Sequence, residues 1–336
     1  LGSPSGHLPK IEASGIAMFV RAGWQDAATV NGTLGRYMTI SIPQQVYIGP
    51  WSHGARQDAD PFHADDTPVE PAQDEQFAQM IGFFDRYLKE DGGEPIESSI
   101  TYYTLGADRW TTTTQWPPTD FENETWFFRE GGRLEPEAPA SALGADEYRV
   151  NFEVTTGRHN RWFTNNGGGG DVVYGDRRAQ DEKLLTFTSV PFDTDREITG
   201  HPIITLYVRS THDDGLFIAY LEDVAPDGRV TYITEGELRG IMRRITDDPP
   251  PYRKIGPHRS ELRKDAMPLV PGEVAELTFE LWATSVLIRE GHSLRIAIAG
   301  ADKDTFDHYP LSGAMPTITV EHNATYPSNV VLPFRQ

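Results

Sequence analysis

Two residues whose side chains could exchange a proton each follow a short apolar run. Asp26 comes after the run at residues 16–20, and His53 comes after the run at residues 46–49. A carboxylate beside an imidazole fixes the tautomer of the ring and stabilises the imidazolium, which prepares the histidine to act as general base and general acid. The sequence therefore offers an acid–base pair, although a loop aspartate and a loop histidine that never meet would show the same spacing.

The two apolar runs indicate strands of a parallel sheet, because continuous apolar runs are typical of strands buried on both faces. Helices are expected over residues 27–38 and 77–90. In open α/β sheets the functional site lies beyond the carboxyl ends of the strands, where Asp26 and His53 stand. Strands buried on both faces need neighbours on each side, so we expect another polypeptide or an upstream segment to complete the sheet.

Three regions of the chain differ in their pattern. Residues 1–92 are expected to be α/β, residues 93–150 to link with a few strands, and residues 151–336 to be all β. Alternation of apolar and polar residues in the last region predicts a β-sandwich, most simply a jelly roll. The runs expected to form its strands are Leu184–Thr188, Ile203–Ser210, Leu216–Val224, Val230–Thr234, Ala275–Leu281, Leu294–Ala299 and Thr317–Glu321. The fold class expected is mainly β with an α/β part.

The residues around Asp26 and His53 form two motifs. Gly23-Trp24-Gln25-Asp26 and Gly49-Pro50-Trp51-Ser52-His53 resemble the Gly-Trp-x-Asp and Gly-Pro-Trp-x-His motifs of the cocaine esterase / X-Pro dipeptidyl-peptidase-like family of serine hydrolases. Four downstream segments, 184–192, 197–200, 221–229 and 291–300, resemble the C-terminal jelly-roll domain of that family. The resemblance covers nearly the whole chain. It implies the C-terminal half of such an enzyme: the end of an α/β-hydrolase domain followed by a jelly roll.

The resemblance assigns Asp26 and His53 to a catalytic triad whose chain order is Ser, Asp, His. It implies that Asp26 orients the imidazole and that His53 moves the proton of the nucleophile. The family's nucleophile is a serine in a Gly-x-Ser-x-Gly elbow upstream of the aspartate, and this sequence contains no such elbow; residues 2–6 carry similar letters at another spacing. The oxyanion-hole donors of the family also lie upstream. We therefore expect the nucleophile to come from sequence outside this chain, encoded by the same gene or carried by a second chain.

Several further residues are candidates for binding roles, each with a structural alternative. Trp24, Trp51 and Phe217 could line an acyl pocket, but packing of the loops and of the sandwich core is the simpler interpretation. The loop residues Asp58, Asp60, His63, Asp65 and Asp66 could bind a cation, but a solvated acidic loop is the simpler interpretation. The segment 155–162, which precedes the glycine run 167–170, could reach the mouth of an active site or could only link two domains.

Composition excludes several classes of protein. The formal net charge is −20, from 50 acidic and 30 basic residues, which argues against a nucleic-acid partner. Cysteine is absent, so a disulfide scaffold, a thiolate nucleophile and a cysteine-ligated metal are excluded. No apolar stretch is long enough to span a membrane. We expect a soluble, cytoplasmic or secreted bacterial protein without a membrane partner, cofactor or catalytic metal.

These observations favour a serine hydrolase that cleaves a carboxylic ester or amide of a small molecule through an acyl-enzyme. The motifs do not distinguish an esterase, an acylase and an Xaa-Pro dipeptidyl-peptidase, and we place ester hydrolysis first because the family is broadest there. The alternative is a non-catalytic β-sandwich module for interaction or carbohydrate binding, or an inactive fragment. In that case Asp26 and His53 would be incidental.

Overall fold

The chain forms two compact units in the computed structural model, which describes residues 4–166 and 171–336. The first, called here the α/β unit, comprises Leu1–Thr119, His159–Val173 and Pro250–Lys254. The second, called the β unit, comprises Asp120–Arg158, Tyr174–Pro249 and Ile255–Gln336. The segment 159–173 therefore belongs to the α/β unit although the chain on both sides of it belongs to the β unit.

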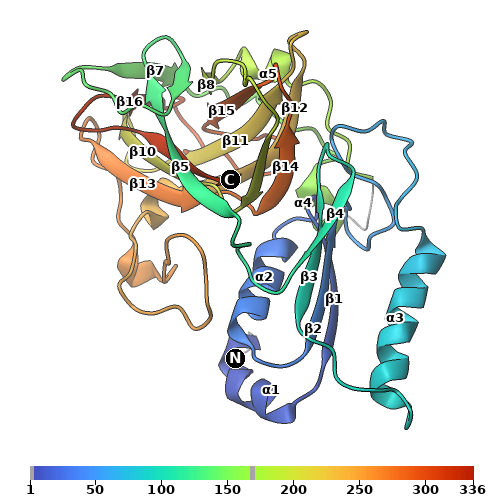
Figure 1. The fold of residues 1–336 in the computed structure, drawn as a ribbon. Coiled ribbons are helices and arrows are strands. Elements are labelled where there is room, and N and C mark those ends of the chain that lie inside the picture. The colour runs from blue at the N-terminus through green and yellow to red at the C-terminus, as the bar shows by residue number, and fades with distance from the viewer. Residues whose placement is uncertain (1–3, 167–170) are drawn as a thin grey trace. The chain divides into compact units, whose positions relative to one another are not determined.

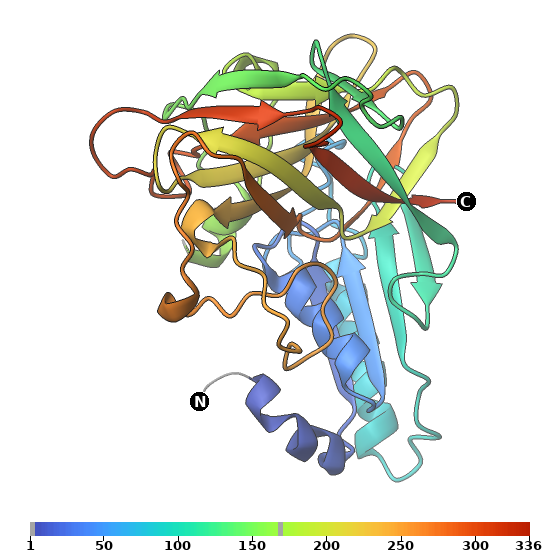
Figure 2. The ribbon, with the colours of Figure 1, turned by 90° about the vertical axis from the view of Figure 1, so that its left-hand side faces the viewer.

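A four-stranded sheet is the centre of the α/β unit (Figure 1). Its strands, in the order β1-β2-β3-β4, are β1 (Met18–Gly23), β2 (Gln44–Gly49), β3 (Ser99–Thr104) and β4 (Arg109–Thr113). The first three strands are parallel, and β4 is antiparallel to β3. The helices of this unit are η1 (Pro4–His7), α1 (Leu8–Ser14), α2 (Thr29–Thr39), α3 (Gln73–Leu88) and α4 (Arg161–Asn166). Figures 1 and 2 show α2 and α3 on opposite faces of the sheet.

The expected strands and helices of the α/β unit are present, with shifted ends. Helix α2 begins at Thr29 and not at residue 27, because Ala27 has a φ of 39° and cannot belong to a right-handed helix. Helix α3 begins at Gln73, earlier than expected, with Asp74 and Glu75 in its first turn, where negative charge stabilises a helix. The helix signal in the sequence came from apolar residues, and these begin only in the second turn.

Strands β3 and β4 belong to this sheet, although the sequence assigned their residues to a linking region. Strand β3 pairs with β2 in parallel register, Val46 opposite Ile100, so β2 has a neighbour on each side. Among the described residues β1 pairs only with β2, and its Phe19 and Arg21 are half-buried. Of the two expected strands, β2 therefore has a neighbour on each side, whereas β1 has an open edge among the described residues.

The β unit is a single hydrogen-bonded sheet that wraps round an apolar core (Figure 1). Its described strands are β5 (Phe121–Arg129), β6 (Arg133–Glu135), β7 (Ala145–Arg149), β8 (Leu185–Thr188), β9 (Arg196–Gly200), β10 (Ile203–Ser210), β11 (Leu216–Val224), β12 (Val230–Arg239), β13 (Ala275–Glu280), β14 (Thr284–Ile288), β15 (Ser293–Ala299), β16 (Thr317–Glu321) and β17 (Asn329–Arg335). Three short helices accompany them: α5 (Arg178–Asp181), η2 (Gly240–Met242) and η3 (Arg263–Asp265).

Burial in the β unit follows the alternation seen in the sequence. In β10, Ile204, Leu206 and Val208 are buried while the residues between them are half-buried. Strand β17, which the sequence did not predict, pairs with β5, β9 and β10. Its run is interrupted by Pro333, a residue that usually argues against a strand. The mainly β fold with an α/β part is therefore confirmed, and the division at residues 92 and 150 stays a prediction.

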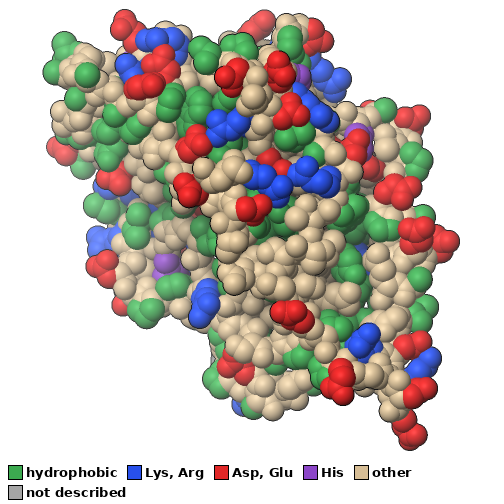
Figure 3. Space-filling model, in the orientation of Figure 1, with side chains coloured by type: hydrophobic (Ala, Val, Ile, Leu, Met, Phe, Trp, Pro, Cys, Tyr) green, Lys and Arg blue, Asp and Glu red, His purple; other side chains and the backbone are tan. Residues whose placement is uncertain are grey.

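Acidic side chains are common on the surface, as the composition suggests. Figure 3 shows Asp and Glu side chains spread over the visible face of the molecule. Within residues 4–166 and 171–336, no helix is both long enough and apolar enough to cross a membrane.

Stacked aromatic rings in the β unit provide a test of its core. Phe128 and Phe187 stack with ring centroids 4.2 Å apart, and both are fully buried. Replacing Phe187 with alanine leaves a cavity, so we expect Phe187→Ala to lower the free energy of unfolding by roughly 3–5 kcal/mol in urea denaturation. The control is Val190→Ala, because Val190 is 74% exposed. Equal effects of the two substitutions would contradict this core.

Candidate functional site

The loops that follow β1 and β2 lie against each other and continue the pairing of the two strands. The backbone N–H of Trp24 donates to the carbonyl of Gly49 at 2.9 Å, and that of Gln25 donates to the carbonyl of Trp51 at 3.1 Å. Glycine is required at both strand ends, because a Cβ at Gly23 would overlap the Trp51 carbonyl and one at Gly49 would overlap the Trp51 ring. These contacts explain why both motifs begin with glycine.

This arrangement brings Asp26 and His53 together. His53 Nδ1 lies 3.1 Å from both carboxylate oxygens of Asp26. The Asp26 side chain is 7% exposed, whereas that of His53 is 53% exposed. Thr29 Oγ1 donates to the Asp26 carbonyl at 2.9 Å and to Oδ2 at 3.2 Å, which steadies the turn and the carboxylate.

The contact determines what the imidazole can do. An Nδ1–H that donates to a carboxylate leaves Nε2 as the free acceptor of the neutral ring. Such an Nε2 can take a proton from a hydroxyl group and return it, while the carboxylate stabilises the imidazolium. The geometry therefore suits a general acid–base pair at the carboxyl ends of parallel strands.

The three predicted pocket residues are fully buried. Trp24 Nε1 donates to the carbonyl of Tyr103 at 2.7 Å, and Trp51 Nε1 donates to the carbonyl of Glu70 at 3.0 Å. Both tryptophans are 1% exposed, and their rings contact those of Trp116 and Trp110. Phe217 in β11 is 0% exposed within the β unit. These positions agree with packing, and a pocket role for the three residues stays a prediction.

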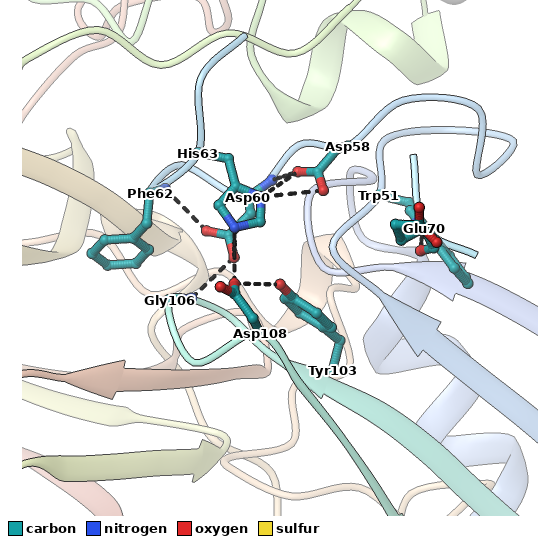
Figure 4. A network of polar contacts seen from close by, with 9 residues as sticks. All are labelled: Trp51, Asp58, Asp60, Phe62, His63, Glu70, Tyr103, Gly106 and Asp108. Carbon is teal, nitrogen blue, oxygen red and sulfur yellow. Dashed lines mark hydrogen bonds and ion pairs between the residues drawn. The ribbon is translucent and has the colours of Figure 1, made fainter. Parts of the chain in front are cut away.

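The acidic loop after His53 forms a network around a second histidine (Figure 4). His63 Nδ1 lies 3.2 Å from Asp58 Oδ2, and Nε2 lies 2.9 Å from Asp108 Oδ1 and 4.0 Å from Asp60 Oδ2. Tyr103 donates to Asp108 at 2.8 Å, and the Gly106 N–H donates to Asp60 at 2.9 Å. Asp108 lies in the turn between β3 and β4, so its place in the network depends on the fold.

The members of this network shift one another's pKa values. Burial alone would lower the pKa of His63, but hydrogen bonds and charges from Asp108, Asp60 and Asp58 outweigh it and raise the pKa. Burial raises the pKa of Asp60 to about 6 and also raises that of Asp58. One possible ligand atom from each of Asp60, His63 and Asp108 lies within 4.8 Å of the other two, a spacing that could hold a metal ion. The other two candidates, Asp65 and Asp66, are exposed.

The segment 155–162, for which an active-site mouth or a linker was expected, contacts the loop that carries Asp26 through Arg161. Arg161 is fully buried in the α/β unit, and its guanidinium donates to backbone carbonyls of the loop that carries Asp26. Nothing in the sequence pattern indicates this contact, because the partners are separated by more than a hundred residues. The glycine run 167–170 lies outside the described residues.

Comparisons with known proteins agree with this fold. Residues 86–331 match the family model described as the X-Pro dipeptidyl-peptidase C-terminal non-catalytic domain. A protein of Mycobacterium bovis named as a serine esterase is 41% identical over 336 residues, which are 99% of this chain and 52% of that protein. Cocaine esterase of a Rhodococcus species is 24% identical over 346 residues, 94% of this chain and 55% of the esterase.

Solved structures share the fold at low sequence identity. An aminopeptidase from a marine-sediment Thaumarchaeota archaeon superposes with a TM-score of 0.73 at 20% identity, covering 96% of this chain and 55% of the aminopeptidase. An α-amino-acid ester hydrolase gives a TM-score of 0.69 at 19% identity, covering 93% of this chain and 54% of the hydrolase.

These matches define a class of hydrolases. The chain belongs to the cocaine esterase / X-Pro dipeptidyl-peptidase-like family and corresponds to its C-terminal half. It spans about half the length of the curated relatives that it matches. The matched non-catalytic domain begins at residue 86, so Asp26 and His53 lie before it.

The His63 network predicts a pH-dependent contribution to stability. A raised folded-state pKa means that the contribution of His63 is fully present below its unfolded value of 6.5 and is lost as the pH rises through the folded value. We expect His63→Gln to lower the free energy of unfolding by roughly 1–3 kcal/mol at about pH 6 and by less at about pH 9.

Urea denaturation at the two pH values measures this difference, with the His7→Gln variant as control because His7 is exposed. A gap between wild type and His63→Gln that widens as the pH rises would contradict the charged network. Asp60 also makes the free energy of unfolding fall as the pH rises, but over a lower pH range, because its pKa rises from 3.8 to about 6 on folding.

Proposed function

We propose that this chain supplies the orienting acid and the general base of a serine hydrolase that cleaves carboxylic esters or amides. The observation that carries the proposal is the contact of His53 Nδ1 with both oxygens of the buried Asp26, with the imidazole half-exposed at the end of parallel strands. Family membership and the names of the relatives support hydrolysis as the reaction class. We place carboxylic esters of small molecules first, before the amides of acylases and of Xaa-Pro dipeptidyl-peptidases.

In the proposed reaction, His53 Nε2 takes the proton of a serine hydroxyl as the serine oxygen attacks the acyl carbon. Asp26 holds the Nδ1–H and stabilises the imidazolium that forms. His53 then gives the proton to the leaving alkoxide or amine, and the acyl group remains on the serine. In the second half, His53 takes a proton from water as the water attacks the acyl-enzyme, and returns it to the serine as the acid is released.

The nucleophilic serine is proposed to come from a partner segment: the N-terminal half of the hydrolase, encoded in the same gene or carried by a second chain. Two features of the α/β unit support such a partner. Strand β1 has an open edge, as noted above, and a parallel strand could pair there. Helix α3 also carries an apolar stripe that the described residues do not cover.

That stripe consists of Phe77, Ile81, Phe84 and Leu88, which are 46–77% exposed. At about 100° per residue these positions fall on one face of the helix. The buried Gln76 and Phe83 lie on another face, where Phe83 contacts Phe19 of β1 at 5.5 Å between ring centroids. A helix with two apolar faces is expected to be covered on both, so we propose that the partner segment packs on the stripe.

Kinetics of the complete protein that contains this chain test the catalytic roles. We expect Asp26→Asn to lower kcat for a p-nitrophenyl ester by about 10⁴-fold, because the amide favours the wrong imidazole tautomer. The variant His53→Ala should lose at least as much, since it removes the general base. The control His7→Ala should match wild type, and thermal unfolding should be unchanged in both active-site variants. Wild-type turnover by His53→Ala would contradict the assignment.

Stability of the complete protein tests the covered stripe. We expect Ile81→Lys to lower the free energy of unfolding by roughly 3 kcal/mol, because a buried ammonium without a partner is costly. The control Glu75→Lys lies on the same helix, away from the stripe, and should change stability by less than about 1 kcal/mol. A change within about 0.5 kcal/mol for Ile81→Lys would show that the stripe stays exposed.

A further inference from the structure

Arg161, the first residue of α4, is a fully buried arginine that donates to two backbone carbonyls. Its Nε donates to the carbonyl of Ala27 at 3.0 Å, and Nη2 donates to the carbonyl of Trp24 at 2.8 Å. In return, the N–H of Ala27 donates to the carbonyl of Arg161 at 3.1 Å. Three hydrogen bonds therefore connect Arg161 to the two residues that flank the turn Gln25–Asp26.

The turn held in this way needs an external restraint. Ala27 has a φ of 39°, a backbone conformation that non-glycine residues adopt at a cost of about 1–3 kcal/mol unless their surroundings hold it. If Ala27 relaxed toward negative φ, the plane of the preceding peptide would turn and the Asp26 carboxylate would rotate away from His53. Arg161 binds the carbonyl of that strained residue and its N–H at the same time.

Arginine is suited to this task in a way that other side chains are not. Its planar guanidinium presents several N–H donors in a fixed arrangement and can bind two carbonyls at once, whereas a lysine ammonium has no fixed plane. Burying a guanidinium costs several kcal/mol, so a residue needed only to fill space would be better as a hydrocarbon. The hydrogen bonds that its N–H groups donate to the carbonyls of Trp24 and Ala27 are what the buried guanidinium contributes.

The same segment also contacts the loop that follows His53. The side-chain amide of Gln57 donates to the carbonyl of Val172 at 2.8 Å and accepts from the N–H of Val172 at 2.7 Å. Residues 159–163 and 171–173 are thus bonded to both loops that carry the acid–base pair. Asn160 caps the first turn of α4 by accepting from the N–H groups of Trp162 and Phe163, which fixes where Arg161 starts.

We propose that Arg161 is a positioning residue of the acid–base pair: it holds the turn 24–27 so that the Asp26 carboxylate faces His53 Nδ1. Arg161 itself makes no contact with substrate in this proposal and acts only through the backbone on either side of Asp26. The proposal rests on the proposed function for its effect on turnover. Its structural part, the orientation of Asp26 toward His53, can be measured without turnover.

Turnover of the complete protein gives the first test. The variant Arg161→Met keeps much of the buried hydrocarbon and removes all donors, and we expect it to lower kcat by about 10²-fold, the loss typical of a small misplacement of a catalytic group. KM should stay within about twofold, because Arg161 is fully buried and is proposed to act through the backbone beside Asp26. We expect Arg161→Lys to fall between wild type and Arg161→Met, and the exposed Arg158→Met to match wild type.

The imidazole ¹⁵N shifts of His53 give the second test, assigned by their loss in His53→Asn. In wild type we expect the Nδ1–H tautomer to dominate, and in Arg161→Met a mixture of both tautomers. If Arg161→Met does not fold, Arg161→Lys decides, because it keeps a cation and most of the buried hydrocarbon; wild-type kcat and wild-type His53 shifts in Arg161→Lys would then overturn the proposal.

Wild-type kcat together with wild-type His53 shifts in Arg161→Met would overturn the proposal. Failure of the proposed function would give a different result from failure of the positioning role. In that case the wild-type protein shows no ester turnover, while the tautomer shift on Arg161 substitution still reports whether Arg161 positions Asp26.

Discussion

Close approach of two strand-end loops is the constraint on which the candidate site depends. Strands β1 and β2 are parallel neighbours, and their pairing continues past the strand ends, where Trp24 donates to Gly49 and Gln25 donates to Trp51 through the backbone. Any larger residue at either glycine would collide with Trp51. The buried tryptophans fill the space beneath, so the loops have little freedom, and Asp26 and His53 face each other as a consequence of the sheet.

A second set of contacts holds these loops from outside. Arg161 and Val172, close in the chain to residues of the β unit, bond to the loops after β1 and β2. The His63 network attaches the acidic loop after His53 to the β3–β4 turn through Asp108. The contact between Asp26 and His53 is therefore supported from two sides. Among the described residues, β1 keeps an open edge and α3 an exposed apolar stripe, which agrees with the partner segment that we propose.

Much of this arrangement could be predicted from sequence because it depends on local patterns. The apolar runs before Asp26 and His53 indicated parallel strands, and parallel strands place their following loops at one edge. Arg161 and Asp108 could not be predicted, since their partners are far away in the chain and arginine or aspartate in a loop is usually solvated. The start of α2 was misplaced because nothing in the sequence signals the positive φ of Ala27, and β17 was missed because of Pro333.

Labelling with a fluorophosphonate tests whether His53 activates a serine that lies outside this chain. The complete protein that contains this chain would be treated with the reagent, in wild-type and His53→Ala forms, and the labelled peptide identified by mass spectrometry. We expect one label per wild-type molecule, on a serine outside these 336 residues, and almost none in His53→Ala. A label on a serine within this chain, or equal labelling of the two forms, would contradict it.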